Sequence, residues 1–291
     1  TTGEVEAGRD PPGLGQVGQI VSAFPFLALL HRAGWAQAFT AMGGVGVGVS
    51  VLGLALIRDS ADGGAEAARR RAETGDRESV WTTMGAVAHQ PGTWLGFFTH
   101  WIGMFPMAVF TLMWGMSWMT EGMGLSASTA SWAITVSTVA GIVGGLLAGS
   151  LSVRLPAHRS TIVLSAGLVS LVAWAAALLS PSHLVSAMVV ASVCGVTGPF
   201  SGIGFDSARS FNEPSRWGTC TGMVNVGGFT ATILAVELVG VVLDATGGRT
   251  DADFRVAFAA TAVVWAMGIT GVAVSRSLTR HRMRDGAVAS F

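Results

Sequence analysis

Eight apolar runs of membrane-spanning length divide this chain of 291 residues. A helix of about 20 apolar residues crosses the hydrocarbon core of a bilayer, because each residue advances the helix by about 1.5 Å. Only 12% of the residues are charged, about half the share usual in a soluble domain. The sequence therefore predicts an all-α integral membrane protein. Its eight transmembrane helices are expected at about 14–31, 35–57, 94–118, 127–150, 160–179, 184–205, 219–243 and 254–277.

The distribution of arginine predicts how these helices are oriented. The chain has no lysine, so all 17 of its basic residues are arginines. If the N-terminus is cytosolic, eight helices place only Arg32, Arg249 and Arg255 outside and every other arginine inside. Cytosolic segments of membrane proteins are enriched in basic residues. We therefore expect both termini, and the polar segment 58–93, to be cytosolic.

A short glycine motif occurs twice, once near each end of the chain. The first copy is Gly13-Leu-Gly-Gln16-Val-Gly18 and the second is Gly222-Met-Val-Asn225-Val-Gly227. Each copy precedes a run that opens with the pattern aromatic-x-x-Ala-Phe. Repeated pairs of membrane helices are typical of transporters built from two related bundles. We therefore expect two helices of a first bundle at 1–57, a cytosolic linker at 58–93 and a six-helix bundle at 94–291.

Glycines within the runs indicate where helices pack against one another. The run 127–150 carries Gly141, Gly145 and Gly149 at four-residue intervals. Small residues four apart let two membrane helices approach closely. We expect these three glycines to be packing positions.

The first two runs carry motifs of a known family. They contain Gly15-Gln-Val-Gly18, then Pro25, then the turn Gly34-Trp35-Ala-Gln-Ala-Phe39. In these motifs the chain resembles the fifth and sixth helices of bacterial transporters of the major facilitator superfamily (MFS). The resemblance implies a twelve-helix fold in which this chain is equivalent to helices 5–12. It also implies a partial chain that lacks the first four helices.

The loop from Gly149 through Arg154 to Arg159 is similar to the cytoplasmic loop between helices eight and nine of the same family. Val153 stands where the family often has aspartate, and Pro156 replaces a glycine. The resemblance implies that Gly149, Arg154 and Arg159 form this loop motif, while the two departures weaken the gating contacts attributed to it.

Two ionisable residues, His100 and Glu237, lie well inside predicted spans, where such residues are costly and are functional candidates by default. Glu237 is the candidate coupling group. The alternative is that its side chain reaches the membrane surface and has no coupling role. Several predicted spans carry polar or thioether side chains, in two of them at helical spacing, and these side chains could line a substrate cavity. The alternative is that they only pack between helices. The cavity candidates are His100, Met104, Ser131, Thr135, Asn225 and Gln16.

The resemblance implies a secondary active, alternating-access permease for a small solute, with a proton as candidate coupling ion, in the bacterial cytoplasmic membrane. One alternative is a fragment of such a permease without transport activity. The stretch Gly222-x-x-Asn225-x-Gly227-Gly228 partly resembles the glycine signature of nitrate and nitrite transporters in this superfamily. A nitrate or nitrite porter is less favoured, because Phe229 interrupts that signature and the run 127–150 lacks the arginine with which that subfamily binds its anion. A membrane-embedded enzyme is the least favoured alternative, because the sequence shows no pair of a nucleophile and a base. We expect no metal, cofactor or nucleic-acid partner.

Overall fold

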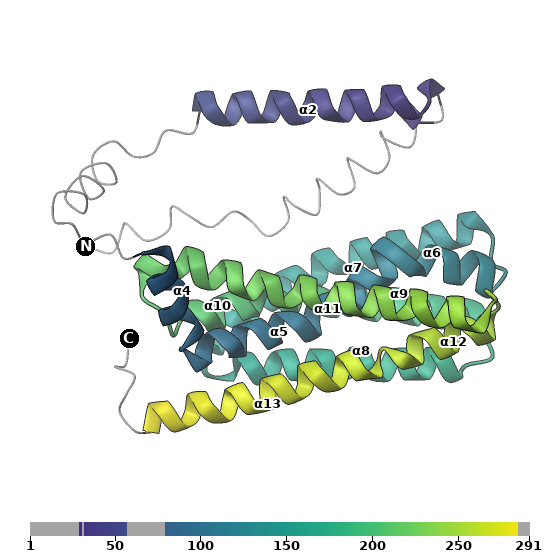
Figure 1. The fold of residues 1–291 in the computed structure, drawn as a ribbon. Coiled ribbons are helices and arrows are strands. Elements are labelled where there is room, and N and C mark those ends of the chain that lie inside the picture. Colours follow the sequence, from purple (N-terminus) through teal and green to yellow (C-terminus); the bar gives the residue numbers. More distant parts are fainter. Residues whose placement is uncertain (1–28, 31, 57–78, 285–291) are drawn as a thin grey trace. The chain divides into compact units, whose positions relative to one another are not determined.

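The computed structural model describes residues 29–30, 32–56 and 79–284. All regular secondary structure in these residues is helical (Figure 1). The chain divides into two compact units. One of them holds residues 14–82, and the described part of the other begins at Thr83. The described part of the first unit contains the helix α2, Trp35–Leu56, together with the first residues of α4, Val80–Ala88.

Seven helical stretches of the described residues are long and apolar enough to cross a membrane, α2 and six in the second unit. We call those six the six-span bundle. The seven stretches confirm seven of the eight predicted helices, and the predicted run 14–31 lies almost wholly outside the described residues. The six spans are Pro91–Gly122, Ala127–Arg154, Pro156–Leu179, His183–Arg209, Pro214–Thr246 and Asp251–Arg284.

Three of the six spans change helical geometry along their length. The first comprises α5 (Pro91–Ala108), the π-helix η1 (Val109–Trp114), α6 (Gly115–Ser117) and the π-helix η2 (Trp118–Gly122). The fourth comprises α9 (His183–Thr197), the 3-10 helix η4 (Gly198–Gly202) and α10 (Ile203–Arg209). The last is α12 (Asp251–Ala260) followed by α13 (Ala262–Arg284). In the first span the change of geometry follows Pro106, and in the fourth it begins at Gly198, next to Pro199. Such changes are expected where proline removes a backbone hydrogen-bond donor.

The remaining three spans are continuous helices, and two of them follow a short 3-10 turn. They are α7 (Ala127–Arg154), α8 (Arg159–Leu179) after the 3-10 turn η3 (Pro156–His158), and α11 (Trp217–Thr246) after the 3-10 turn η5 (Pro214–Arg216). The Ser126 side chain caps the start of α7, and Gly247, at φ 71°, ends α11 in the left-handed region that glycine tolerates. Successive spans run in opposite directions, so the η3 turn, the start of α11 and the end of α13 share one end of the bundle (Figure 1).

The core of the six-span bundle is aromatic. Trp118 stacks on Trp174 with ring centroids 5.6 Å apart, and the Phe258 ring lies against both. Large apolar side chains also cover the outside, such as Leu146 on α7 and Leu168 on α8, which are 60% and 58% exposed. A soluble monomer seldom exposes such extensive apolar surface, whereas helices facing lipid require it. The bundle is therefore that of an integral membrane protein.

Candidate functional site

His100 lies inside the six-span bundle, where α5 meets η4, α10 and α11. The side chain is only 6% exposed. Its Nδ1 atom is 3.0 Å from the backbone oxygen of Ser201, and its ring lies 4.6 Å from that of Phe205. The Nε2 atom is buried and has no hydrogen-bond partner among the described residues. One ring nitrogen is thus held by the protein, while the other lies buried close to Gly228 of α11.

Met104 lies one turn after His100 and faces the same neighbour on α11. A Cβ atom on Gly228 would lie 2.4 Å from Cδ2 of His100 and 2.6 Å from Sδ of Met104. At Gly227 a Cβ atom would lie 2.6 Å from the backbone oxygen of Phe97. These two glycines therefore let α11 press directly onto α5. The predicted candidates His100 and Met104 are brought together by this contact.

Asn225 and Glu237 lie on a different face of α11 from these glycines. Both residues are exposed within the second unit. Phe229 and Ile233 follow Asn225 at four-residue steps and are 50% and 60% exposed. Glu237 continues the same series. Nothing in its own unit covers this broad face of α11. The face therefore carries the Asn225 amide and, three helical turns further along, the Glu237 carboxyl group.

Ser131 and Thr135 share one face of α7. Ser131 is exposed and Thr135 is half-buried. The Thr135 hydroxyl donates to the backbone oxygen of Ser131 at 2.9 Å, and that of Thr138 donates to Ile134 at 3.1 Å. These hydroxyl hydrogens are used within the helix, while oxygen lone pairs remain to accept a bond. The described residues show no hydrogen bond from this face to His100 or Asn225.

The loop between α7 and α8 is held by Arg159. Its Nε atom donates to the backbone oxygen of Ser152 at 3.2 Å and to the hydroxyl of that serine at 3.1 Å. Its Nη1 atom donates to the backbone oxygen of Asp206 at 3.2 Å and to the hydroxyl of Ser210 at 2.8 Å. The Ser152 hydroxyl in turn donates to the Asp206 carboxylate at 2.6 Å. This cluster ties α7, α8 and α10 together at one end, whereas Gly149 and Arg154 are exposed.

A comparison with protein-family models identifies the family of this chain. The family model described as Major Facilitator Superfamily matches residues 13–207. The chain belongs to the major facilitator superfamily. It is therefore a membrane transporter of that family, embedded in the bilayer and acting on a small-molecule substrate. Neither curated proteins nor solved structures gave a match.

The structure of this MFS transporter adds two residues that sequence reasoning missed. The helix predicted at 184–205 ended just before Asp206, whereas α10 continues to Arg209, so Asp206 was counted as a loop residue. Ser152 carried no signal of its own, since a lone serine near the end of a helix is common. Their bond becomes visible only when the ends of α7 and α10 are placed together.

The candidate Gln16 lies outside the described residues of the MFS transporter, so its place in a substrate cavity stays a prediction. Among the described residues no group of three or more His, Cys, Asp or Glu side chains is placed to hold a metal ion. The two cysteines, Cys194 and Cys220, are buried and unbonded to each other.

Proposed function

We propose that this MFS transporter is a secondary active permease that moves a small polar solute by alternating access. We further propose that the exposed face of α11 lines its pathway. The observation that carries the proposal is Glu237, an ionisable side chain exposed on α11 in the interior of a transmembrane span.

The depth of Glu237 supports this assignment. The 30 residues of α11 extend for about 45 Å, whereas the hydrocarbon core is about 30 Å thick. Glu237 lies nine residues before Thr246, which is about 14 Å from the end of the helix and so within hydrocarbon depth. A carboxylate facing acyl chains there would cost on the order of 2–3 kcal/mol or more. The face is therefore expected to meet protein or a water-filled pathway, where Glu237 can exchange a proton.

Three other places supply polar contacts for a solute. Asn225 offers both donors and an acceptor on the Glu237 face, and Ser131 and Thr135 offer acceptor lone pairs on α7. His100 offers its unpaired Nε2 atom, with Met104 beside it. None of these groups is a fixed cation, so an uncharged or zwitterionic polar solute fits them better than an anion.

The proposal extends to the parts that precede the six-span bundle. We propose that residues 1–57 are the last two helices of an N-terminal bundle, with Gln16 facing Asn225 across the pathway. Residues 58–93 then form a cytosolic linker, and residues 94–291 the C-terminal bundle. Both termini are proposed to be cytosolic in a bacterial cytoplasmic membrane, on the basis of the arginine distribution.

Uptake into proteoliposomes tests the proposal. The purified chain is assayed with a panel of labelled amino acids, sugars, nucleosides and organic acids, with and without an imposed pH gradient. We expect accumulation of at least one solute, coupled to the gradient. If the panel shows only passive leak while a co-reconstituted N-terminal bundle restores uptake, the chain alone is not a transport-competent unit. Leak in both preparations overturns the proposal.

Cysteine labelling tests the proposed orientation. Ala157 in η3 and Ala252 in α12 are both exposed and lie at opposite ends of the six-span bundle. In intact cells, a membrane-impermeant maleimide should label an Ala252→Cys variant, and an Ala157→Cys variant should be labelled only after lysis. The native thiols give little background, because both are fully buried. The reverse pattern would show that the bundle is inserted the other way round.

A substitution at His100 separates a binding role from a packing role. A His100→Gln variant keeps a side chain that can bond to the Ser201 oxygen but changes the group presented at the Nε2 position. If that nitrogen contacts the solute, the apparent affinity in the uptake assay should fall by about tenfold, the value of one hydrogen bond to a polar ligand of about 1.4 kcal/mol. The thermal stability should change little. Unaltered uptake with lower stability would assign His100 to packing alone.

A further inference from the structure

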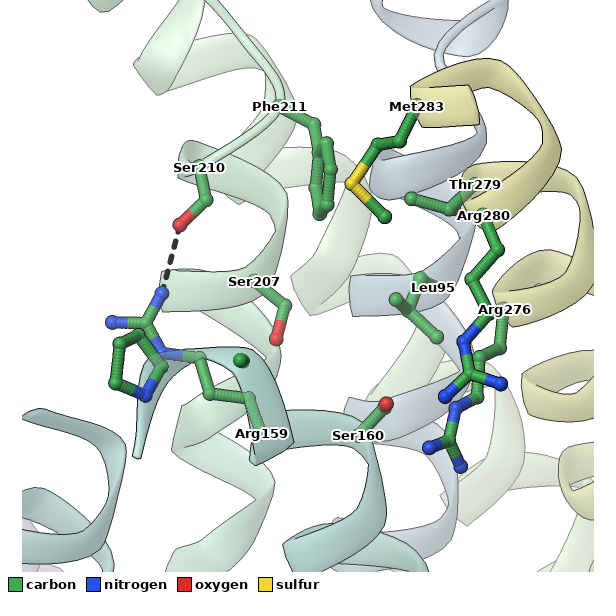
Figure 2. A pocket seen from close by; sticks show the side chains of 12 residues that line it. Leu95, Arg159, Ser160, Ser207, Ser210, Phe211, Arg276, Thr279, Arg280 and Met283 are labelled. Atoms are coloured by element: carbon green, nitrogen blue, oxygen red, sulfur yellow. Dashed lines mark hydrogen bonds between the residues drawn. The ribbon is translucent and has the colours of Figure 1, made fainter. Parts of the chain in front are cut away.

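A pocket rich in arginine lies at the end of the bundle that carries the η3 turn. It has a volume of about 360 Å³, within the range of small-ligand pockets, which is about 300–1,000 Å³. Four helices contribute to it, namely α5, α8, α10 and α13. Three of its lining side chains are the guanidinium groups of Arg159, Arg276 and Arg280, and no lining residue is acidic (Figure 2).

The two arginines of α13 that line the pocket, Arg276 and Arg280, have no counter-charge among the described residues. Arg276 and Arg280 are four residues apart on one helix, so their charges lie close and repel one another. Within the described residues neither forms an ion pair with a carboxylate. Arg276 donates through Nη2 to the Thr161 hydroxyl at 2.8 Å, which holds its guanidinium between α13 and α8. A bound anion would relieve the repulsion and use the remaining donors.

Neutral donors complete the site for an anion. Ser160, in the first turn of α8, is buried, and its hydroxyl makes no hydrogen bond with any described residue. Figure 2 shows this hydroxyl pointing into the pocket, between Ser207 and the arginines of α13. No side chain caps the start of α8, so its first backbone N–H groups add positive potential at the same place. Guanidinium, hydroxyl and helix N-terminus together favour a phosphate group.

The surroundings of the pocket favour a phosphate carried by a lipid. Since Arg276 bonds to Thr161, the two helices meet there, and residues seven positions deeper lie on the same faces. These are Ile269 on α13 and Leu168 on α8, which are 38% and 58% exposed. An acyl chain can lie along this apolar seam while its phosphate sits among the arginines. A soluble phosphate would make no use of the seam.

We propose that this pocket binds the phosphate headgroup of an anionic phospholipid of the membrane. Basic pockets between helices on the cytoplasmic side of membrane proteins recognise such headgroups. The site uses no residue of the proposed transport pathway. The proposal therefore stands or falls independently of the transported solute.

Native mass spectrometry of the purified chain with phosphatidylglycerol or phosphatidylcholine tests the proposal. We expect one tightly retained phosphatidylglycerol and no equivalent retention of phosphatidylcholine. The Arg276→Gln/Arg280→Gln variant should weaken that binding by about 30-fold, since each arginine contributes about 1 kcal/mol near a charged lipid surface. Arg282→Gln is the matched control, because Arg282 is exposed on the same helix and does not line the pocket.

Further measurements exclude a folding artefact and a soluble ligand. Arg280→Gln alone leaves the Arg276–Thr161 bond intact and should still weaken binding several-fold, with an unchanged melting temperature. Inorganic phosphate at millimolar concentration should neither bind in calorimetry nor displace the lipid. Equal retention of phosphatidylglycerol by the double variant and the wild type would overturn the proposal. Phosphate binding without lipid retention would overturn the lipid assignment as well.

Discussion

A Glu237→Gln variant should lose accumulation of solute driven by a pH gradient while it retains exchange of solute across the membrane. A pH difference of one unit is worth about 1.4 kcal/mol per proton, which sustains about tenfold accumulation when one proton moves with each solute. Glutamine has nearly the shape of glutamate but cannot exchange a proton at neutral pH. Accumulation should therefore collapse to the equilibrium ratio of one, as measured by gradient-driven uptake and counterflow in proteoliposomes.

Asp244→Asn is the matched control for this prediction. Asp244 is exposed on α11, two turns beyond Glu237 and close to the end of the helix. Its carboxylate is expected at the membrane surface, where it is hydrated and need not cycle a proton. The control should accumulate solute normally. If Glu237→Gln also accumulates solute normally, the carboxyl group has no coupling role, and its depth in the membrane is no evidence for proton transfer.

The transmembrane helices were predictable because their signal is both strong and local. Runs of about 20 apolar residues have few alternatives to a membrane helix, since every backbone polar group in lipid must be bonded within the segment. The structure accordingly begins α7 at Ala127, the same residue as the predicted run, and ends α8 at Leu179, again as predicted. The ends that extend furthest beyond prediction are polar. The last span runs past its predicted end, residue 277, to Arg284, and Asp206 and Arg209 likewise continue α10 beyond the apolar part of its sequence.

The arrangement of the site was less predictable, because the faces of a membrane helix carry little pattern. In a soluble protein the polar face is the outer one, whereas here both lipid and core faces are apolar. The sequence therefore singled out His100 and Asn225 as polar residues at membrane depth but could not separate them. The structure buries His100 against Gly228 and leaves Asn225 on an exposed face of α11.

The packing glycines of α7 show the same limit. Four-residue spacing pointed to Gly141, Gly145 and Gly149, and Gly141 is buried as expected. For Gly145 and Gly149 the prediction was wrong within the described bundle, because a Cβ atom on either would meet nothing within 4 Å. The contact is made by Gly144, whose Cβ atom would lie 2.2 Å from the backbone oxygen of Val196 in α9. A shift of one residue rotates the contact by about 100°, which spacing alone does not resolve.

This difference predicts a large loss of stability from the addition of a single methyl group. Gly144→Ala should destabilise the bundle by about 1–3 kcal/mol, because backbone atoms of α9 cannot move away as a flexible side chain would. A second contact of the same kind pins the two helices, since a Cβ atom on Gly195 would lie 2.3 Å from the backbone oxygen of Ser137. The helices therefore cannot separate at one glycine without straining the other. Thermal unfolding in detergent, followed by tryptophan fluorescence, measures the effect.

Gly145→Ala is a control at the neighbouring position of the same helix. Alanine is a better helix former than glycine by about 1 kcal/mol, and the new methyl group meets no atom within 4 Å. This variant should melt at the wild-type temperature or above it, whereas Gly144→Ala should melt well below it. Equal melting temperatures for the two variants would mean that α7 and α9 do not approach through Gly144. A lower stability for Gly145→Ala alone would restore the register that the four-residue spacing suggested, with α7 rotated by about 100°.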